Sequence, residues 1–223
     1  MDYEKNQKYF KPISYGGQIA LIIIGALLLL GLMSTNFLLA FLFGGGMLAL
    51  GIFLIVLKKK NIVTDRQYDE QVGSMLKDMQ GRALNKLGID EDEVKEIAPI
   101  SFDGYVYKGA DYAKKGEDGL YRTNKYESVI LFFSEHEVHC YTYNFTTTQK
   151  KQTESTDVYF YKDIVSVSTA SETVEVLGFK IDYEYFKLTT AGGTALSVSL
   201  RDVDNAQRSI NAMRALLKTK KQG

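Results

Sequence analysis

The chain has 223 residues, a formal net charge of zero from 27 basic and 27 acidic side chains, two histidines and a single cysteine, Cys140. Because balanced charge gives no overall attraction to nucleic acid, we expect no nucleic-acid partner. One cysteine excludes an intramolecular disulfide and is typical of a reducing compartment.

The segment 18–57 is unusual because it contains no Asp, Glu, Lys or Arg. Two apolar runs, 13–33 and 37–57, each have about the 20 residues that a helix needs to cross the hydrocarbon core of a bilayer. Only Ser34, Thr35 and Asn36 separate them, which leaves room for a tight turn. A cleaved signal peptide is disfavoured, because the first run is too long and a second follows at once. We therefore predict an antiparallel membrane hairpin with the lipid bilayer as its partner.

Lysines flank this hairpin and indicate its orientation. Lys5, Lys8 and Lys11 precede the first run, residues 58–60 are all lysine, and the turn carries no charge. Because basic residues stay on the cytoplasmic side, we expect a multi-pass protein of the cell membrane with both termini and its soluble domain in the cytoplasm.

Small residues recur at a spacing of four in the second apolar run. Ala40 and Gly44 form one such pair, and Gly45 and Ala49 form another. This spacing lets helix backbones approach closely in lipid, either within the hairpin or between two copies in a homodimer. We favour packing within the hairpin.

Residues 61–100 are predicted to form a helical connector. Apolar side chains recur at spacings of three and four from Tyr68 to Leu87, and Gly88 is typical of a helix end, so we predict a helix over 65–87. A second, short helix is expected from Asp90 toward Ile97. The polar side of the long helix mixes both signs of charge, which favours packing on protein over lying on a membrane surface.

From residue 101 onward the apolar pattern alternates with a period of two, which is typical of strands. A final helix from about residue 202 would bury an apolar stripe centred on Ile210 and Met213. The strands are predicted at about 101–108, 126–134, 137–145, 157–169, 172–177, 179–190 and 194–200.

This order of elements over 101–219 resembles the pleckstrin-homology-like (PH-like) barrel. The segments 84–91 (LNKLGIDE), 129–134 (VILFFS) and 159–163 (YFYKD) resemble uncharacterised bacterial two-pass membrane proteins with a PH-like cytoplasmic domain. The resemblance implies a membrane α-hairpin plus an α+β domain, a seven-stranded antiparallel PH-like barrel closed by a C-terminal helix. The expected domains are 1–60 (N-terminal tail and transmembrane hairpin), 61–100 (connector) and 101–223 (barrel).

Candidate chemistry is sparse. His136, His139 and Cys140 form the one cluster with metal-ligating side chains, but zinc needs four ligands, and adjacent strand residues point to opposite faces. Cys140 shares a face with Val138 and is interpreted as a core residue. The acidic residues Asp103, Glu117, Asp118, Asp157 and Asp163 show no pairing typical of general acid–base catalysis. We therefore predict no catalytic, cofactor-binding or metal-binding residues, and no cofactor.

Aromatic residues are concentrated on one face of the predicted strand 137–145. Tyr141, Tyr143 and Phe145 share that face with Glu137 and His139. An outward face would suit contact with a protein or a planar ligand, whereas an inward one would pack under the helix 65–87; we favour packing.

Two functions from different classes remain open at this point. The first is a non-enzymatic, membrane-tethered adaptor or scaffold that binds an unknown protein partner. The alternative is a sensor whose domain binds a small ligand, such as a nucleotide, and signals to the hairpin. The apolar inward pattern at Val129, Leu131 and Phe133 indicates a filled interior and favours the adaptor.

Overall fold

The computed structural model describes residues 1–222, and the chain divides into two compact units. One contains residues 8–64 and the other combines residues 1–7 with the chain from Asp65 onward. Residues 65–100 belong to the unit that contains the sheets. The N-terminal helix α1 (Tyr3–Phe10) begins in that unit, where the Asn6 amide donates to the Thr147 carbonyl at 2.9 Å.

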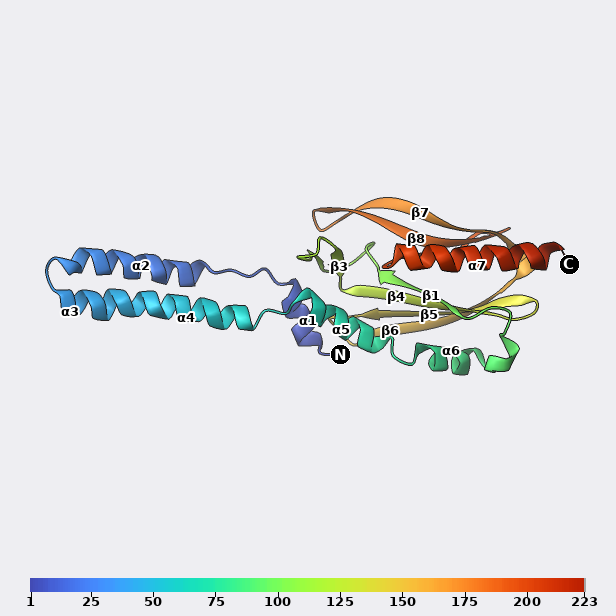
Figure 1. Cartoon of the computed structure of the whole chain (residues 1–223), viewed down its shortest axis with the longest axis horizontal. Helices are drawn as coiled ribbons and strands as arrows, with labels where there is room; N and C mark the ends of the chain where they lie inside the picture. Colours follow the sequence, from blue (N-terminus) through green and yellow to red (C-terminus); the bar gives the residue numbers. More distant parts are fainter. Residues whose placement is uncertain (223) are drawn as a thin grey trace. The chain divides into compact units, whose positions relative to one another are not determined.

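The unit 8–64 is a hairpin of two apolar helices (Figure 1). The first is α2 (Gly16–Met33), and the second runs through α3 (Phe37–Leu39), the π-helical η1 (Ala40–Gly45) and α4 (Gly46–Lys60). The Asn36 side chain accepts the Leu39 N–H at 3.1 Å and caps the second helix. By length and composition, both helices can cross a membrane.

Small residues bring the two helices of the hairpin together. Ala40 and Gly44 are buried, and a Cβ on Gly44 would lie only 2.5 Å from the backbone nitrogen of Leu29. The expectation that this pair packs within the hairpin is confirmed. Ala49 of the second small pair is exposed instead.

The helices that precede the sheets are α5 (Asp65–Met75), α6 (Met79–Leu87) and the 3₁₀ turn η2 (Glu91–Glu93). The predicted continuous helix 65–87 is wrong at Asp78, whose left-handed φ of 55° interrupts the helical backbone. Gly88, with a φ of 69°, ends α6 as predicted. The capping box of Asp90 and Glu93 forms, but its helix ends after a single turn.

Three antiparallel sheets follow along the chain. The order of the four-stranded sheet is β1-β4-β5-β6, β2 pairs with β3, and the three-stranded sheet has the order β7-β8-β9. The strands are β1 (Ile100–Tyr105), β2 (Ala113–Lys115), β3 (Tyr121–Thr123), β4 (Lys125–Phe133), β5 (Glu137–Thr146), β6 (Lys151–Phe160), β7 (Ile164–Val176), β8 (Phe179–Thr190) and β9 (Gly193–Ser199).

The predicted seven-stranded barrel is wrong, because none of the three sheets closes. The expected strand 157–169 breaks at the 3₁₀ turn η3 (Tyr161–Asp163), so β6 and β7 belong to different sheets. At the other edge β1 and β9 cross closely, since a Cβ on Gly104 would lie 2.7 Å from the Ser199 carbonyl carbon. The Arg201 N–H donates to the Asp103 carbonyl there at 2.9 Å, but no ladder joins the two larger sheets within residues 1–222.

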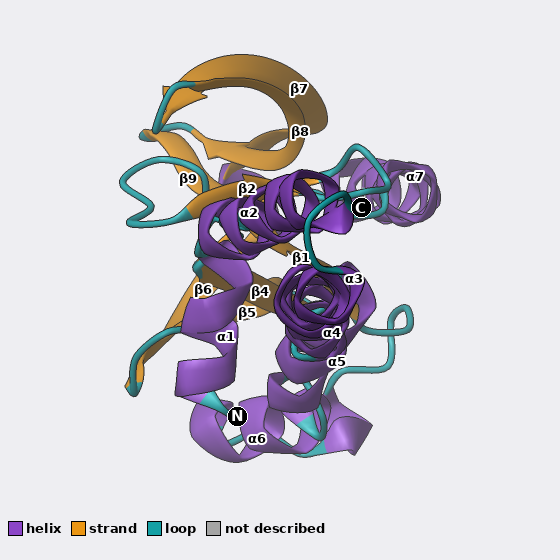
Figure 2. Cartoon of the chain, turned by 90° about the vertical axis from the view of Figure 1, so that its left-hand side faces the viewer, coloured by secondary structure: helices purple, strands orange, loops and turns teal. Residues whose placement is uncertain are grey.

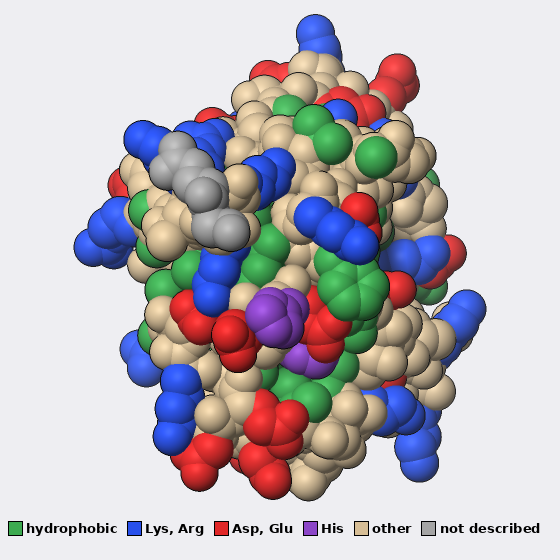
Figure 3. Space-filling model, turned by 90° about the vertical axis from the view of Figure 1, so that its right-hand side faces the viewer, with side chains coloured by type: hydrophobic (Ala, Val, Ile, Leu, Met, Phe, Trp, Pro, Cys, Tyr) green, Lys and Arg blue, Asp and Glu red, His purple; other side chains and the backbone are tan. Residues whose placement is uncertain are grey.

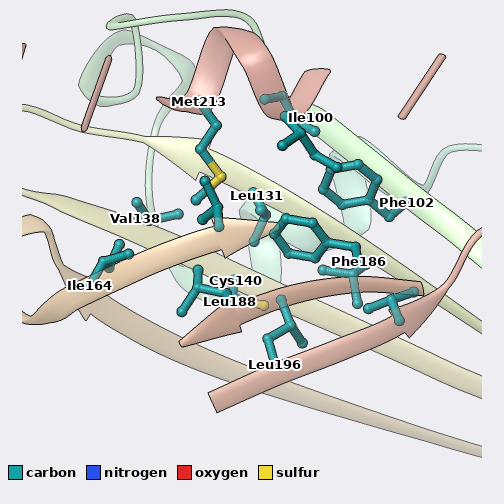
Figure 4. Close-up of a cluster of buried hydrophobic side chains, with 14 of the residues drawn as sticks. Ile100, Phe102, Leu131, Val138, Cys140, Ile164, Phe186, Leu188, Leu196 and Met213 are labelled. Carbon is teal, nitrogen blue, oxygen red and sulfur yellow. The ribbon is translucent and has the colours of Figure 1, made fainter. Parts of the chain in front are cut away.

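The main core lies between the four-stranded sheet, the three-stranded sheet and α7 (Val203–Gln222), which packs alongside them (Figures 2 and 4). Ile210 and Met213 of α7 are completely buried, which confirms the predicted stripe. The rings of Phe102 and Phe186 stack across the sheets at 4.3 Å between centroids.

The opposite face of the four-stranded sheet is also covered. Tyr141, Tyr143 and Phe145 are buried, and the Arg82 guanidinium of α6 lies 4.6 Å from the centre of the Tyr143 ring. The expectation that this aromatic face packs under the helical segment is confirmed. Strand β4 is buried almost throughout because both faces of its sheet are covered.

Candidate functional site

The unit with the sheets contains a pocket of about 530 Å³ between the β2–β3 hairpin, β8 and the junction of β9 with α7. This volume lies in the range of about 300–1,000 Å³ that is typical of small-molecule sites. We call it the tyrosine–arginine pocket, and its lining includes Tyr105, Tyr107, Tyr121, Tyr183, Arg122, Arg201, Lys180, Asp182 and Glu184.

Ring contacts and hydrogen bonds fix the tyrosines on one side of the pocket. The rings of Tyr107 and Tyr183 are tilted against each other with centroids 4.9 Å apart. The Tyr183 hydroxyl donates to Glu172 Oε2 at 2.9 Å, and Glu172 also pairs with Lys108 at 2.6 Å. These partners lie on β7, β8 and the loop after β1, so three segments hold the aromatic wall in place.

Two arginines of the pocket bind one carboxylate, Asp69 on α5. Arg122 of β3 donates from Nε and Nη2 to the two oxygens of Asp69, both at 2.9 Å. Arg201 contacts Asp69 Oδ2 through Nη2 at 3.0 Å, and the Tyr105 hydroxyl donates to Asp69 Oδ1 at 2.7 Å. Arg122 also binds Asp118, at 2.9 and 2.7 Å. The arrangement joins the first helix after the hairpin to the wall of the pocket.

The two guanidinium groups differ in how much a ligand can reach. The side chain of Arg122 is 4% exposed and is engaged by two carboxylates, whereas that of Arg201 is 38% exposed. Lys180 adds a second exposed cation at the pocket. Arg201 and Lys180 are therefore the cations available to an anionic group.

Burial and neighbouring charges together set the protonation states of Asp69, Asp118 and Tyr105. Burial alone would raise the pKa of Asp69, but hydrogen bonds from Arg122 and Tyr105 outweigh it and hold the pKa below its ordinary value. The hydrogen bond from Arg122 lowers the pKa of Asp118 to about 2. Burial raises the pKa of the Tyr105 hydroxyl, which therefore remains a donor at neutral pH.

The pocket can bind a flat ligand that carries an anion. Aromatic rings such as those of Tyr107 and Tyr183 offer faces for stacking, and Arg201 offers a fork of donors for phosphate or carboxylate. Asp182 and Glu184 provide acceptors for hydroxyl or amino groups. A nucleotide combines all three kinds of group.

The histidines and the cysteine lie away from this pocket. Cys140 is buried in the main core, where burial raises the pKa of its thiol to about 12, so it is no nucleophile. His136 pairs with Glu135 at 3.9 Å and His139 with Glu137 at 3.3 Å, on a face where acidic side chains surround both histidines (Figure 3). Within residues 1–222, no three His, Cys, Asp or Glu side chains are placed to bind one metal ion.

Two of the acidic residues considered in the sequence, Asp103 and Asp118, form side-chain hydrogen bonds in the structure. Asp118 binds Arg122, and Asp103 accepts a hydrogen bond from the Tyr126 hydroxyl. A further carboxylate, Glu127, lies half-buried on β4, and burial raises its pKa to about 7. It lines a separate, smaller pocket with Lys108.

Sequence reasoning missed the pocket because its residues are widely separated along the chain. Tyr105, Arg122, Tyr183 and Arg201 of the lining come from four different segments, and Asp69, which binds both arginines, comes from a fifth. One signal was present: the chain has 27 basic residues, of which six are arginines. Arginine suits buried or bidentate pairs with carboxylates, so positions 122 and 201 merited attention.

These features define a class of protein in which an apolar two-helix hairpin is joined to a unit that contains two larger sheets and an aromatic, arginine-lined pocket. No protein-family model, curated protein or solved structure matches the chain.

Proposed function

We propose that this chain is a non-enzymatic, membrane-anchored binding module, and that the tyrosine–arginine pocket binds a nucleotide or a similar planar anion. The observation that carries the proposal is the pocket itself. It combines a fixed pair of tyrosine rings with a partly exposed guanidinium in a space large enough for a nucleotide. The apolar interior favoured the adaptor, but the pocket lies outside that interior and supports a ligand-binding role.

The network around Asp69 supplies a route from the pocket to α5. Arg201 both lines the pocket and binds Asp69 of α5, whose first residue follows the last residue of α4 by five positions. A phosphate that draws the Arg201 guanidinium toward itself weakens its pair with Asp69. Ligand binding would then weaken the ion pair between Arg201 and Asp69, which is one of the contacts that fix α5 to the unit with the sheets. Helix α5 is the first helix after the hairpin in the chain.

The apolar hairpin is the proposed membrane anchor. Lysines at both of its chain ends and none in the Ser34–Asn36 turn support an arrangement with both termini and the pocket in the cytoplasm. Anchoring raises the effective concentration of a binding module near membrane partners, which is the benefit of such a leash.

A thermal-shift panel on the full-length protein in detergent tests the proposed ligand class. The probes are purine and pyrimidine nucleotides, the matching nucleosides, and inorganic phosphate. A ligand at 100 times its Kd stabilises the folded state by about 2.7 kcal/mol, so at least one nucleotide should raise the melting temperature clearly. Nucleosides and inorganic phosphate should raise the melting temperature less, because nucleosides lack the anion and phosphate lacks the planar base. No shift with any nucleotide would refute the proposal.

A second candidate function, protein binding as an adaptor, is favoured by strand β6. It is an edge strand of the four-stranded sheet, and nine of its ten residues are exposed, including Val158 at 46% and Phe160 at 47%. An extended segment of a partner can add to such an edge. Val158→Lys should abolish capture of that partner while leaving ligand-induced thermal shifts unchanged.

A further inference from the structure

Two exposed leucines lie at neighbouring hairpin ends of the unit with the sheets. Leu177 is 61% exposed in the β7–β8 turn, and Leu120 is 58% exposed in the β2–β3 loop. The rings of Tyr121 and Phe179 join these hairpins with centroids 5.5 Å apart. Both hairpin ends lie at the same end of the unit (Figure 1). Together they present an apolar tip that no described side chain covers fully.

The conformation of Leu177 makes its exposure more informative. Leu177 and Gly178 have φ values of 51° and 83°, the left-handed pair that a tight hairpin turn of this kind requires. Asn or Asp is the usual residue at the first of these positions, and bulky side chains there are uncommon. Leucine is conformationally unfavourable at this position, and its 61% exposure leaves an apolar side chain in water. Both costs point to an apolar environment for this side chain.

The β2–β3 loop of the apolar tip contacts the start of α5, which follows the hairpin closely in sequence. The Glu117 N–H of the β2–β3 loop donates to the Asp65 carboxylate at 2.7 Å, and Asp65 is the first residue of α5. Residues 61–64 alone separate it from Lys60, the last residue of α4. Five peptide steps span at most about 17 Å. If α4 crosses a bilayer, covalent connection keeps this loop close to its surface.

The residues around the tip are those typical of a membrane interface. Lys115 Nζ lies 5.4 Å from the centre of the Tyr121 ring, and Lys180 is exposed beside Phe179. Amphipathic tyrosine and lysine side chains place an apolar body in lipid and a polar end in water. Glu175 lies opposite Lys180 in the strand register and offsets its charge. Attraction of this surface to a membrane would therefore not depend on net positive charge.

We infer that Leu177 and Leu120 form a second membrane contact, in which the two hairpin ends insert their leucines into the cytoplasmic leaflet beside the anchor. The inference rests on the membrane anchor proposed above. The partner of the apolar tip is the lipid bilayer, which the tip contacts by inserting apolar side chains and not by binding phosphate headgroups. Contact with zwitterionic lipid should therefore suffice.

Single-cysteine labelling of the full-length protein in phosphatidylcholine vesicles tests this contact. The native Cys140 is completely buried, so introduced cysteines take up the dye selectively. An environment-sensitive fluorophore is attached at Leu177→Cys. Val165→Cys is the matched control, because Val165 is 62% exposed at the opposite end of β7. Leu30→Cys, on the exposed side of α2, reports on the hairpin.

We expect a spin-labelled lipid with a shallow nitroxide to quench the Leu177 probe about two-fold or more, as for other residues at the headgroup boundary. The Val165 probe should remain unquenched, and a nitroxide within the acyl chains should quench the Leu30 probe. Quenching at Leu30 without quenching at Leu177 overturns the second contact and leaves the anchor intact. Absence of quenching at Leu30 overturns both.

A second variant separates lipid contact from contact with protein. Leu177→Asn suits the left-handed position, so it should fold with unchanged or higher thermal stability. With the fluorophore at Leu120→Cys, this variant should lose most of the lipid quenching. A blue-shifted Leu120 or Leu177 probe that lipid nitroxides do not quench would show that a second copy or another protein covers the tip, and would refute the lipid contact.

Discussion

Asp69 of α5 and Arg122 of β3 form a bidentate ion pair with two hydrogen bonds of 2.9 Å, and the Arg122 side chain is almost completely buried. Removing Asp69 leaves the buried Arg122 guanidinium with Asp118 as its remaining carboxylate partner and deprives Arg201 and Tyr105 of the acceptor they share. Breaking the pair by mutating one partner should therefore lower the free energy of unfolding, because the remaining group stays buried with fewer partners.

We expect Asp69→Asn to lower the free energy of unfolding of the full-length protein by about 3 kcal/mol at neutral pH. Glu70→Gln is the matched control on the same helix, since Glu70 forms only an exposed pair with Arg66, which is worth about 0–1 kcal/mol. Chemical denaturation followed by circular dichroism measures both. Equal effects of the two variants would contradict a structural role for the Asp69 pair.

The same pair should make stability depend on acid. Arg122 and Tyr105 hold the pKa of Asp69 below its unfolded value of about 4, so its contribution is complete above that pH. As pH falls below about 4, the unfolded state takes up the proton first and the contribution is lost. The difference in stability between the wild type and Asp69→Asn should therefore be constant above pH 5 and shrink below pH 4.

Glu127 should show the opposite pH dependence. Burial raises its folded-state pKa to about 7, above the unfolded value of about 4.3. The folded state therefore loses stability as pH rises from about 4 to about 7, because ionisation is easier in the unfolded chain. Glu127→Gln removes this effect and should stabilise the protein by about 2 kcal/mol at pH 8, allowing for partial solvent exposure. At pH 4 the two proteins should be equally stable; a pH-independent difference would contradict the raised pKa.

The closing helix should be essential to the core. Ile210 of α7 is completely buried in the main core, so Ile210→Asp places a carboxylate in an apolar site and should cost several kcal/mol. Asn211→Asp introduces the same side chain at the next, exposed position and should change little. Thermal melts of the two variants settle the comparison, and similar melting temperatures would show that α7 is not a core element.

How much could be predicted from the sequence differs from element to element. The helices of the hairpin, β4, β5 and α7 follow from local composition and periodicity, and the structure contains each of them. Strand β6 was recognised only in part, because 151–157 carries polar side chains on both faces and gives no alternating signal. The barrel was wrong because closure depends on pairing between distant edges, and the break at η3 sends β6 and β7 into separate sheets.

The pocket depended even more on distant relationships. Tyr107 and Tyr183 meet because β8 returns from a separate sheet, and Arg201 reaches Asp69 across more than half of the chain. No local pattern records such meetings. Only the choice of arginine over lysine at 122 and 201 hinted at shared carboxylate partners.

Membrane topology is accessible in intact cells that express the protein. Thr35→Cys lies in the turn of the hairpin, and Thr219→Cys lies at an exposed position on α7. With both termini in the cytoplasm, an impermeant maleimide should label the first variant in intact cells and the second only after lysis. Labelling in the reverse order would contradict the proposed orientation.

The most direct measurement is a calorimetric titration of the full-length protein in lipid nanodiscs with the nucleotide that gives the largest thermal shift. Arg201→Gln removes the partly exposed guanidinium of the pocket, and Arg208→Gln removes an exposed one on α7 as the matched control. Because hydrogen bonds to charged groups contribute about 1.5–3 kcal/mol, we expect Arg201→Gln to weaken binding by about ten-fold or more and Arg208→Gln to bind like the wild type. Equal affinity of all three proteins, or no heat of binding to the wild type, would contradict the assignment of the tyrosine–arginine pocket as the ligand site.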